Sequence, residues 1–541
     1  MAGLQAAFKA VDTFIEQQMA AAGTPGVAVA VTDRERLRHL STHGWADIAA
    51  QRPISVDTLF EIGSISKSFT AIALLQLSEA GLVDLQAPVR RYLPWFQVRS
   101  RYEAITIHHM LSHTAGIISG TEFSGEARFE VWALRETEAC TPPGTHFYYS
   151  NAGYKALGLV LEAVEGKGYG EIVRERILTP LGMDATEPVI VHGIRDRMAV
   201  GYEAIYDDRP VGPGGPLLPA TWFESATADG SIASTAGEMA TYVRMLLNRG
   251  RGGEGRVLSE EDFGLMIQRA IALPEEDREE GSFYGYGLHI GEEDGSLVVS
   301  HSGGMVGYYA AIRADLDEGL GVAVLSNGPG DPVGIVRFAL QALRAAQRGH
   351  SLPDLPAVVD PRQVENASDY AGTYHNEAGV LELTAEGQCL LLGYDGQRLI
   401  LERHDEDCFR VPHPRLWRFP LRFGRVDGQV VEAFHGPAVY AKEGYGSSAA
   451  AAVPGSWTAF PGHYRSHNPW YTNFRIVLRK GRLLLIEPWG EEQGLEPMGD
   501  GLFRIGVDAR SPERLWFGTI LDGRAIWANR SGCDYYRTFT P

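Results

Sequence analysis

The N-terminal part of the chain alternates helical and extended hydrophobic patterns. Leu4–Ala21 places apolar residues on one helical face, interrupted by charged positions, which predicts an amphipathic helix. Val27–Val31 is a continuous apolar run and, together with Leu37–Gly44, predicts two neighbouring strands. Phe69–Leu77 then has the apolar spacing of a buried helix. A helix, two adjacent strands and a second helix are typical of an α/β core with an antiparallel sheet.

The central part of the chain is predicted to be a helical block inserted into this α/β core. From Glu79 to Ser282 the helical candidates are Ile107–Leu111, Gly153–Val164, Tyr169–Leu178 and Ala236–Leu247. Extended patterns then return at Tyr286–Ile290, Leu297–His301, Tyr308–Arg313 and Gly321–Ser326, before a helix at Val333–Gln347. The loop Tyr202–Trp222 is rich in glycine and proline, and we expect it to border a site.

The C-terminal part contains an internal repeat of short strands. Tyr370–Tyr374 (YAGTY) resembles Phe460–Tyr464 (FPGHY) about 90 residues later, and Phe409–Val411 resembles Phe503–Ile505 in the same order. The repeat predicts two copies of one small antiparallel β-barrel, joined by a flexible low-complexity tether at Gly444–Pro454. We therefore expect a first domain at 1–349, a linker at 350–365, a β-domain at 366–443, a linker at 444–458 and a second β-domain at 459–541.

Composition and charge narrow the class of protein. The 541 residues are 44% apolar and 22% charged, as in ordinary globular proteins, and the net charge of −19 argues against nucleic acid or an anionic membrane as partner. No apolar run is long enough to span a membrane, and the first helix lacks the unbroken apolar core of a secretory signal, so a cytoplasmic location is expected. The four cysteines form no C-x-x-C motif, and pairing of Cys389 with Cys408 stays open.

The first chemical candidate is the pair Ser64 and Lys67, at the start of the predicted buried helix. A spacing of three residues places both side chains on one helical face. A serine hydroxyl becomes a nucleophile when a base takes its proton, and a partly buried lysine can be that base. Ser-x-x-Lys alone is a weak motif, since chance matches occur in a chain of this length.

Two further stretches carry polar groups on Pro- and Gly-bounded segments. Tyr149 and Asn151 lie in a Tyr-x-Asn sequence that can direct a phenol and an amide at one point, although a core tyrosine beside a helix N-cap is the alternative. His301–Gly304 (HSGG) lies at the end of a predicted strand, where glycines allow backbone N–H groups to approach a ligand closely. A turn at the end of a strand is the alternative there.

Together, these motifs resemble the three-motif set of the penicillin-recognising serine hydrolases. This group includes class C β-lactamases, DD-carboxypeptidases, D-aminopeptidases and β-lactamase-like esterases. The resemblance rests on Ser64–Lys67, Tyr149–Asn151 and His301–Gly303, with Ile105–Gly116 as a further similar segment, and it covers about residues 5 to 347. It implies an α/β (α+β) catalytic domain with an antiparallel sheet and a helical insertion, followed by two lipocalin-like antiparallel β-barrels. It also gives His109 and His113 a structural role, in place of the zinc site that their spacing would suggest.

The third motif departs from the pattern of classical β-lactamases. Those enzymes carry Lys-Thr-Gly where this chain has His301-Ser302-Gly303, and a histidine is charged only part of the time near neutral pH. The histidine form and the three-domain layout are similar to D-aminopeptidases, and similar fusions occur in hydrolases of linearised microcystin. The resemblance therefore implies hydrolysis of amide bonds in small peptides containing D-amino acids, with an esterase for short acyl esters as the alternative. A binding protein without catalysis is the other class considered.

The resemblance also implies a role for each site residue. Ser64 is expected to attack the carbonyl, Lys67 and Tyr149 to move its proton, and Asn151 to orient Lys67. His301 is expected to assist proton transfer or substrate binding. The oxyanion and substrate site is expected to use Ser64, Ser302, Gly303 and Gly304, with the backbone N–H groups of Ser64 and Gly304 forming the oxyanion hole. No metal or organic cofactor is required, a small peptide is the expected partner, and a homodimer is considered as the assembly.

Overall fold

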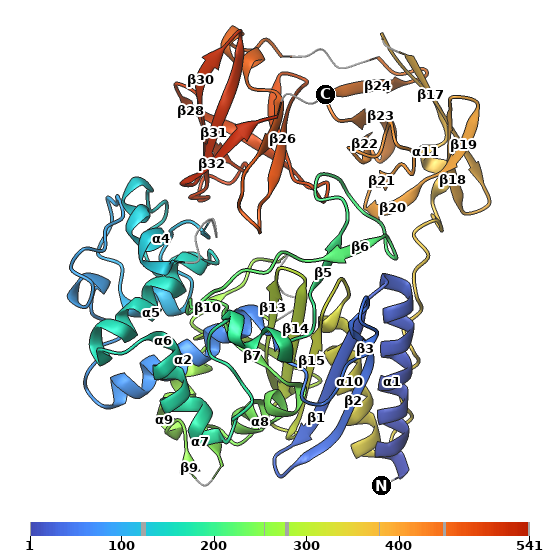
Figure 1. Cartoon of the computed structure of the whole chain (residues 1–541). Helices are drawn as coiled ribbons and strands as arrows, with labels where there is room; N and C mark the ends of the chain where they lie inside the picture. Colours follow the sequence, from blue (N-terminus) through green and yellow to red (C-terminus); the bar gives the residue numbers. More distant parts are fainter. Residues whose placement is uncertain are drawn as a thin grey trace. The chain divides into compact units, whose positions relative to one another are not determined.

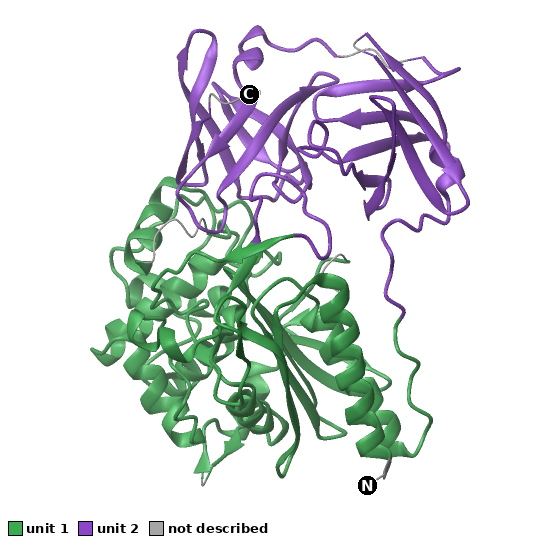
Figure 2. Ribbon diagram, turned by 45° about the vertical axis from the view of Figure 1, so that its right-hand side comes forward, with its two compact units in different colours: residues 1–203, 216–356 green, residues 204–215, 357–541 purple. Residues whose placement is uncertain are grey.

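The structure is a computed structural model that describes residues 2–120, 126–253, 255–275, 281–377, 379–446 and 451–538. The chain forms two compact units, coloured green and purple in Figure 2. The first unit holds Met1–Glu203 and Pro216–Pro356, and the second holds Ala204–Gly215 and Ala357–Pro541. The domain limits expected from the sequence, which also separate the two β-domains from each other, stay a prediction.

The first unit is built on an antiparallel sheet in which the two ends of the unit's sequence meet. Within the described residues its strand order is β10-β11-β12-β13-β14-β15-β1-β2-β3. The strands are β1 (Gly26–Asp33), β2 (Leu37–Asp47), β3 (Arg52–Pro53), β10 (Ile271–Ala272), β11 (Phe283–Tyr284), β12 (His289–Glu293), β13 (Ser296–Met305), β14 (Tyr308–Asp315) and β15 (Leu320–Ser326). Val29 of β1 pairs with Val324 of β15, so the predicted α/β core with its inserted block is confirmed.

Helices cover both faces of the sheet (Figure 1). α1 (Ala2–Ala22) and α10 (Pro332–Arg348) pack against each other on one face, where the Phe14 and Phe338 rings lie 4.6 Å apart between centroids. α8 (Ala236–Leu247) packs on the other face against β1 and β15. The apolar side chains between α1, α10 and the sheet are nearly all fully buried and form one hydrophobic core cluster.

The inserted block surrounds a buried helix. α2 (Ser66–Glu79) has eleven buried residues and contacts several of its neighbours in the block. The other helices of the block are α3 (Ile107–Leu111), α4 (Ala127–Ala133), α5 (Asn151–Glu165), α6 (Tyr169–Val173), α7 (Thr179–Leu181) and α9 (Glu260–Met266). A π-helical turn at Arg174–Leu178 joins α6 to α7, so the helix predicted at Tyr169–Leu178 is present but not uniformly α-helical.

Two strand predictions near the site were wrong in their limits. The predicted strand Tyr286–Ile290 begins only at His289, because Gly287 turns with a φ of +72° and lies directly against α2. The predicted strand Leu297–His301 continues to Met305, because its pairing with β14 extends through Gly304 opposite Tyr309. His301–Gly304 is therefore part of a strand and not a turn at its end.

The second unit contains two antiparallel β structures that follow each other in the sequence. The first is a barrel-like sheet preceded by α11 (Ala367–Tyr370), with strands β16 (Gly372–Asn376), β17 (Gly379–Glu386), β18 (Cys389–Tyr394), β19 (Gln397–Ile400), β20 (Glu402–Asp405), β21 (Cys408–Arg410), β22 (Leu421–Val426), β23 (Gln429–His435) and β24 (Ala438–Lys442). The second is a closed barrel with strands β25 (Gly462–Arg465), β26 (Asn473–Arg479), β27 (Arg482–Ile486), β28 (Glu492–Gly499), β29 (Leu502–Ile505), β30 (Arg514–Leu521), β31 (Arg524–Arg530) and β32 (Cys533–Arg537). The predicted fold class is confirmed.

The sequence repeat corresponds to the same interaction in both barrels. The hydroxyl of Tyr374 donates to the carbonyl of Tyr370 at 2.8 Å, and that of Tyr464 donates to Phe460 at 2.7 Å. Each barrel also has a cluster of three aromatic rings from the repeated motifs, formed by Tyr370, Phe409 and Phe423 in one and Phe460, Phe503 and Phe517 in the other. The repeated residues are thus the aromatic core of each barrel.

Part of the Gly- and Pro-rich loop belongs to the second unit. Within that unit, Asp207 forms an ion pair with Arg465, and Asp208 pairs with Arg475 at 3.0 Å. The expectation that Tyr202–Trp222 borders a site is not tested by these contacts and stays a prediction. The central residues of the predicted tether, 447–450, lie outside the described residues.

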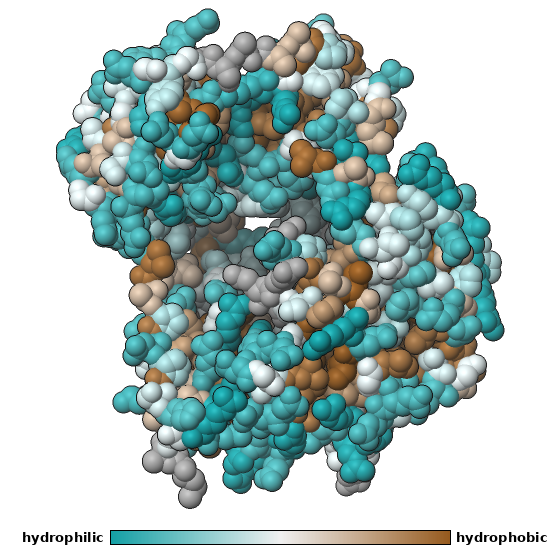
Figure 3. Space-filling view, turned by 180° about the vertical axis from the view of Figure 1, so that it is seen from behind, coloured by the Kyte–Doolittle hydropathy of each residue, from teal (hydrophilic) through white to brown (hydrophobic). Residues whose placement is uncertain are grey.

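Three observations complete the description. All four cysteines have free thiols, so Cys389 and Cys408 are not paired. In the part of the chain that the structure describes, none of the helices combines the length and the apolar character needed to cross a membrane. On the face drawn in Figure 3 hydrophilic residues predominate, with smaller hydrophobic patches between them.

Candidate active site

Ser64 and Lys67 contact each other beneath the sheet edge. Ser64 lies in a 3₁₀ turn, Gly63–Ile65, which leads directly into α2, so it precedes the α-helix and is not within it. In such a turn residues three apart align, and the ammonium of Lys67 donates to Ser64 Oγ at 2.9 Å. Lys67 also donates to the carbonyl of Asp229 at 2.8 Å and is completely buried. When Lys67 is neutral, the same geometry lets it accept the proton of the Ser64 hydroxyl.

Tyr149 lies beside this pair, and Asn151 follows it at the start of α5. The N-cap of α5 is Ser150, whose Oγ accepts from the N–H of Gly153 at 3.0 Å, so Asn151 is the first helical residue and not the cap. Lys67 Nζ lies 4.9 Å from the centroid of the Tyr149 ring. Among the described residues the buried Oδ1 of Asn151 has no hydrogen-bond partner, and it is therefore available to accept from a bound molecule.

Two glycines, Gly63 and Gly303, allow β13 to contact the turn that carries Ser64. A side chain at Gly303 would overlap the carbonyl oxygen of Ile62, and one at Gly63 would lie 2.7 Å from the backbone nitrogen of Gly304. β12 begins at His289, which pairs with Ser300, so in the described part of the sheet β13 beyond Ser300 pairs only with β14. The free edge of β13 therefore lies next to Ser64, which brings its backbone N–H groups near the nucleophile.

His301 is buried and held by hydrogen bonds within the protein. Its Nδ1 lies 2.5 Å from the carbonyl oxygen of Ser302, and its Nε2 lies 3.0 Å from the hydroxyl of Tyr284. Because a carbonyl only accepts, Nδ1 carries a hydrogen, and Nε2 shares a hydrogen bond with the Tyr284 hydroxyl. His301 is only 3% exposed. These contacts hold the His301 ring in place, and its expected part in proton transfer or substrate binding stays a prediction.

A layer of aromatic and histidine rings lies under the site. The rings of His113 and Tyr149 are 4.2 Å apart between centroids, and those of His289 and His301 are 5.0 Å apart. His113 Nδ1 accepts from the N–H of Ser150 at 3.0 Å. Burial, with the nearby charge of Lys67, holds the pKa of His113 well below its usual range, so His113 is neutral.

The second histidine of the same segment is also used structurally. His109 caps α3 together with Thr106, whose N–H donates to His109 Nδ1 at 3.2 Å. Each of the two histidines thus accepts a backbone N–H group through one ring nitrogen. These contacts match the structural role that the sequence implied for them.

A buried ion pair that the sequence did not suggest lies behind Lys67. Lys155 of α5 contacts Glu130 of α4 at 2.6 Å, and the carboxylate of Asp229 lies 4.0 Å from the same ammonium. Both members of the pair are almost fully buried. The signal in the sequence was a single lysine within the otherwise apolar stretch Tyr154–Val160, but its partner lies on another helix and could not be identified from spacing.

Glu61 is a second buried ionisable residue that the sequence did not suggest. It lies on β4 (Phe60–Glu61), three residues before Ser64, and is 5% exposed. In the described residues no hydrogen bond or ion pair reaches its carboxyl group. Burial raises the pKa of Glu61 to about 8, so the carboxyl is mainly protonated at neutral pH.

Substitution of Gly303 by alanine tests the contact between β13 and the Ser64 turn. We expect Gly303→Ala to lower the free energy of unfolding by about 1–3 kcal/mol, because the new methyl group overlaps the Ile62 carbonyl. Labelling of Ser64 by a fluorophosphonate probe should also slow. Gly304→Ala is the matched control for stability, since a side chain there meets nothing within 4 Å. Equal urea-unfolding curves for the two variants would contradict the close packing described.

Substitution of Glu61 by glutamine tests the buried carboxyl. The folded state holds the Glu61 proton up to about pH 8, whereas the unfolded state releases it near the ordinary value of 4.5. The wild type therefore loses stability as the pH rises between these values, and Glu61→Gln does not. We expect the free energy of unfolding of Glu61→Gln, relative to wild type, to rise by at least about 1 kcal/mol from pH 5 to pH 9.

The control for this experiment is Glu103→Gln, at an exposed position in the same unit. Its stability should follow the wild type at every pH. Parallel pH profiles for wild type and Glu61→Gln would show that the carboxyl is not held protonated by burial.

Comparison with known proteins gives the same family as the geometry. Residues 11–346 match the family described as Beta-lactamase. Penicillin-binding protein 4 of Amycolatopsis lactamdurans is 30% identical over 370 residues, which cover 66% of this chain and 94% of that protein.

Two solved structures are also similar. The octameric penicillin-binding protein homologue from Pyrococcus abyssi is 26% identical, with a TM-score of 0.60 over 80% of this chain and 98% of that chain. The D-stereospecific amidohydrolase from Streptomyces sp. is 25% identical, with a TM-score of 0.51 over 64% of this chain and 99% of that chain. Because the family match spans more than half of the sequence and the Ser64–Lys67 pair is in place, the chain belongs to the beta-lactamase family of serine hydrolases.

Proposed function

We propose that this serine hydrolase cleaves amide bonds of small peptides containing D-amino acids through an acyl-enzyme. The observation that carries the proposal is the hydrogen bond between Lys67 and Ser64, next to the free edge of β13. The preference for D-residues is supported by the similarity to the D-stereospecific amidohydrolase and by the histidine in place of lysine in the third motif.

In the acylation step, Ser64 Oγ attacks the substrate carbonyl carbon while its proton moves to the neutral amine of Lys67. A tetrahedral intermediate forms, and its negative oxygen accepts from the backbone N–H groups of Ser64 and Gly304. The C–N bond then breaks, and the leaving amine takes a proton that Lys67 supplies through Tyr149. The products of this step are the free amine and an ester between the acyl group and Ser64.

In the deacylation step, a water molecule attacks the ester carbonyl. Tyr149 and Lys67 take the proton of the water, the bond to Ser64 Oγ breaks, and the serine recovers its proton. Asn151 Oδ1, buried without a partner among the described residues, is suited to accept from the substrate N–H. His301, held by Tyr284 and the Ser302 carbonyl, would keep the strand of Ser302 and Gly303 in register for binding.

Several finer statements belong to this proposal. A substrate of the linearised-microcystin type is one member of the proposed class. A homodimer stays a prediction for this chain, and the Pyrococcus abyssi homologue is an octamer. A cytoplasmic location likewise stays a prediction.

Substitution of the nucleophile is the first test. We expect Ser64→Ala to lower kcat/KM for an amide substrate by at least about 10⁴-fold, because removal of a serine nucleophile abolishes the covalent route. Circular dichroism should show that the fold is kept. Ser78→Ala, on the same helix and away from the site, is the matched control and should retain wild-type activity. A Ser64→Ala protein with most of its activity would exclude the mechanism.

A substrate panel tests the specificity. We expect turnover of D-alanine p-nitroanilide or of a blocked peptide with an internal D-Ala–Leu bond, and none of the L-alanine anilide. Turnover of the blocked peptide alone would make the enzyme an endopeptidase. Turnover of p-nitrophenyl acetate alone would assign the protein to the esterases and reject the amide mechanism.

A further inference from the structure

A pocket in the first unit has a lining that is rich in arginine and does not include Ser64. Its volume is about 550 Å³, which is within the size range of small-molecule sites. Arg34 follows β1, Arg244 lies on α8, and Arg251 and Arg256 lie on the paired strands β8 (Arg251–Gly252) and β9 (Gly255–Arg256). We propose that this arginine pocket binds a small molecule with two or more anionic groups, such as a polyphosphate.

The charges of these four arginines are not neutralised within the described residues. No carboxylate forms an ion pair with any of them, and three are held by neutral acceptors instead. Arg34 donates to the carbonyl of Leu316 at 2.6 Å, Arg244 to the hydroxyl of Thr241 at 3.1 Å, and Arg256 to the carbonyl of Arg249 at 3.0 Å. Neutral acceptors orient a guanidinium group but leave its positive charge in place.

This arrangement differs from that of other arginines in the same unit. Arg174 and Arg197 both pair with Glu187 at 2.6 Å, and Arg344 pairs with Asp315 at the same distance. In a chain with a net charge of −19, carboxylates are abundant, yet among the described residues Glu35 is the only acidic residue that lines the arginine pocket. A local excess of positive charge in an acidic protein attracts anions.

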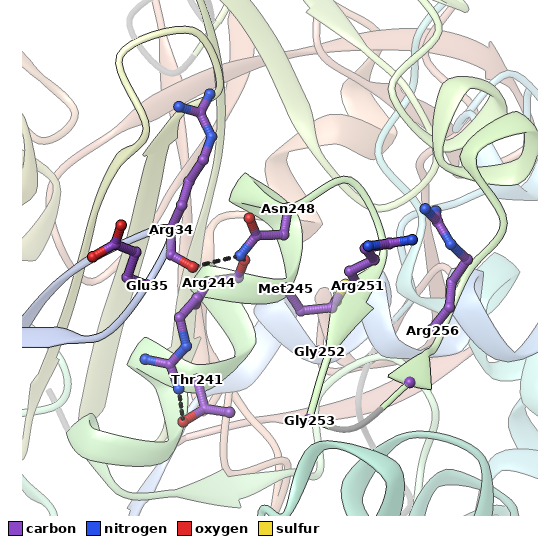
Figure 4. Close-up of a pocket in the computed structure, with 11 residues that line it drawn as sticks. Arg34, Glu35, Thr241, Arg244, Met245, Asn248, Arg251, Gly252, Gly253 and Arg256 are labelled. Atoms are coloured by element: carbon purple, nitrogen blue, oxygen red, sulfur yellow. Dashed lines mark hydrogen bonds between the residues drawn. The ribbon is translucent and has the colours of Figure 1, made fainter.

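The positions of the guanidinium groups indicate the size of the ligand. In Figure 4, Arg251 and Arg256 extend to one side of the pocket, whereas the groups of Arg34 and Arg244 lie on the other side of Asn248. One orthophosphate ion cannot contact guanidinium groups on both sides of Asn248, whereas a ligand with separated anionic groups can. Guanidinium groups bind phosphate oxygens in a bidentate manner, which favours phosphate as the anionic group.

The arginine pocket is separate from the active site. α8 begins at Ala236, directly after β7 (Ala233–Ser234), and β7 pairs with the strand that contains Glu61. The pocket residues of α8 and its C-cap run from Thr241, in the middle of the helix, to Asn248 at its C-terminal end. At 1.5 Å per residue, this places them about 8 to 18 Å along the helix from Ala236. The proposal therefore does not depend on the proposed function.

Isothermal titration calorimetry on the full chain tests the proposal, with tripolyphosphate and orthophosphate compared at constant ionic strength. We expect tripolyphosphate to bind at least about tenfold more tightly than orthophosphate, because it can contact more than one arginine. Arg251→Gln should weaken tripolyphosphate binding by at least about fivefold, and the double variant Arg244→Gln/Arg251→Gln should weaken it further. Glu35→Gln should tighten it, since one repulsive charge is removed.

Arg91→Gln is the matched control for the loss of one positive charge. Arg91 is exposed, lies outside the pocket and pairs with Asp84 at 3.6 Å. It should leave the affinity unchanged, and all variants should melt at the wild-type temperature without anion. Absence of tripolyphosphate binding, or equal weakening by Arg91→Gln and Arg251→Gln, would overturn the proposal and leave only general attraction of anions to the surface.

Discussion

The active site depends on the close approach of β13 to the 3₁₀ turn of Ser64. Only glycine at positions 63 and 303 permits this approach, because a β-carbon at either position would overlap or crowd the opposite backbone. The contact fixes Ser64 relative to the free edge of β13, and α2 carries Lys67 into position from the same turn. The nucleophile, its base and the backbone N–H groups are thus positioned by a single contact between two backbones.

The surroundings of this contact contain several buried polar groups, which are costly unless they are paired or neutral. Lys155 and Glu130 satisfy each other, and Lys67 is held by Ser64 and the carbonyl of Asp229. Glu61 avoids the cost by staying protonated, and His113 by staying neutral. The pattern is typical of a site in which the protein sets protonation states before substrate binds.

The two units show how different constraints act on one chain. In the first unit, strands from the two ends of its sequence pair with each other, and the inserted block lies between them in the sequence. The site therefore combines residues that are far apart along the chain. In the second unit each barrel repeats one local design, in which a tyrosine hydroxyl and three aromatic rings fill the core. The arginine pocket adds a charge pattern that neither the core nor the catalytic site requires.

The sequence alone determined the strands and helices of the core, the repeat, and the residues of the three motifs, because these are recorded in local periodicity and in motif spacing. It could not place Lys155 against Glu130, Tyr284 against His301, or Asp229 against Lys67, because each contact joins segments that only the folded chain brings together. The strand predicted from the sequence also ended too early, at His301, because pairing with β14 extends β13 beyond its apolar run. Local sequence patterns identified the residues that carry the chemistry. Tertiary packing decided which of these residues contact each other and which protonation state each one has.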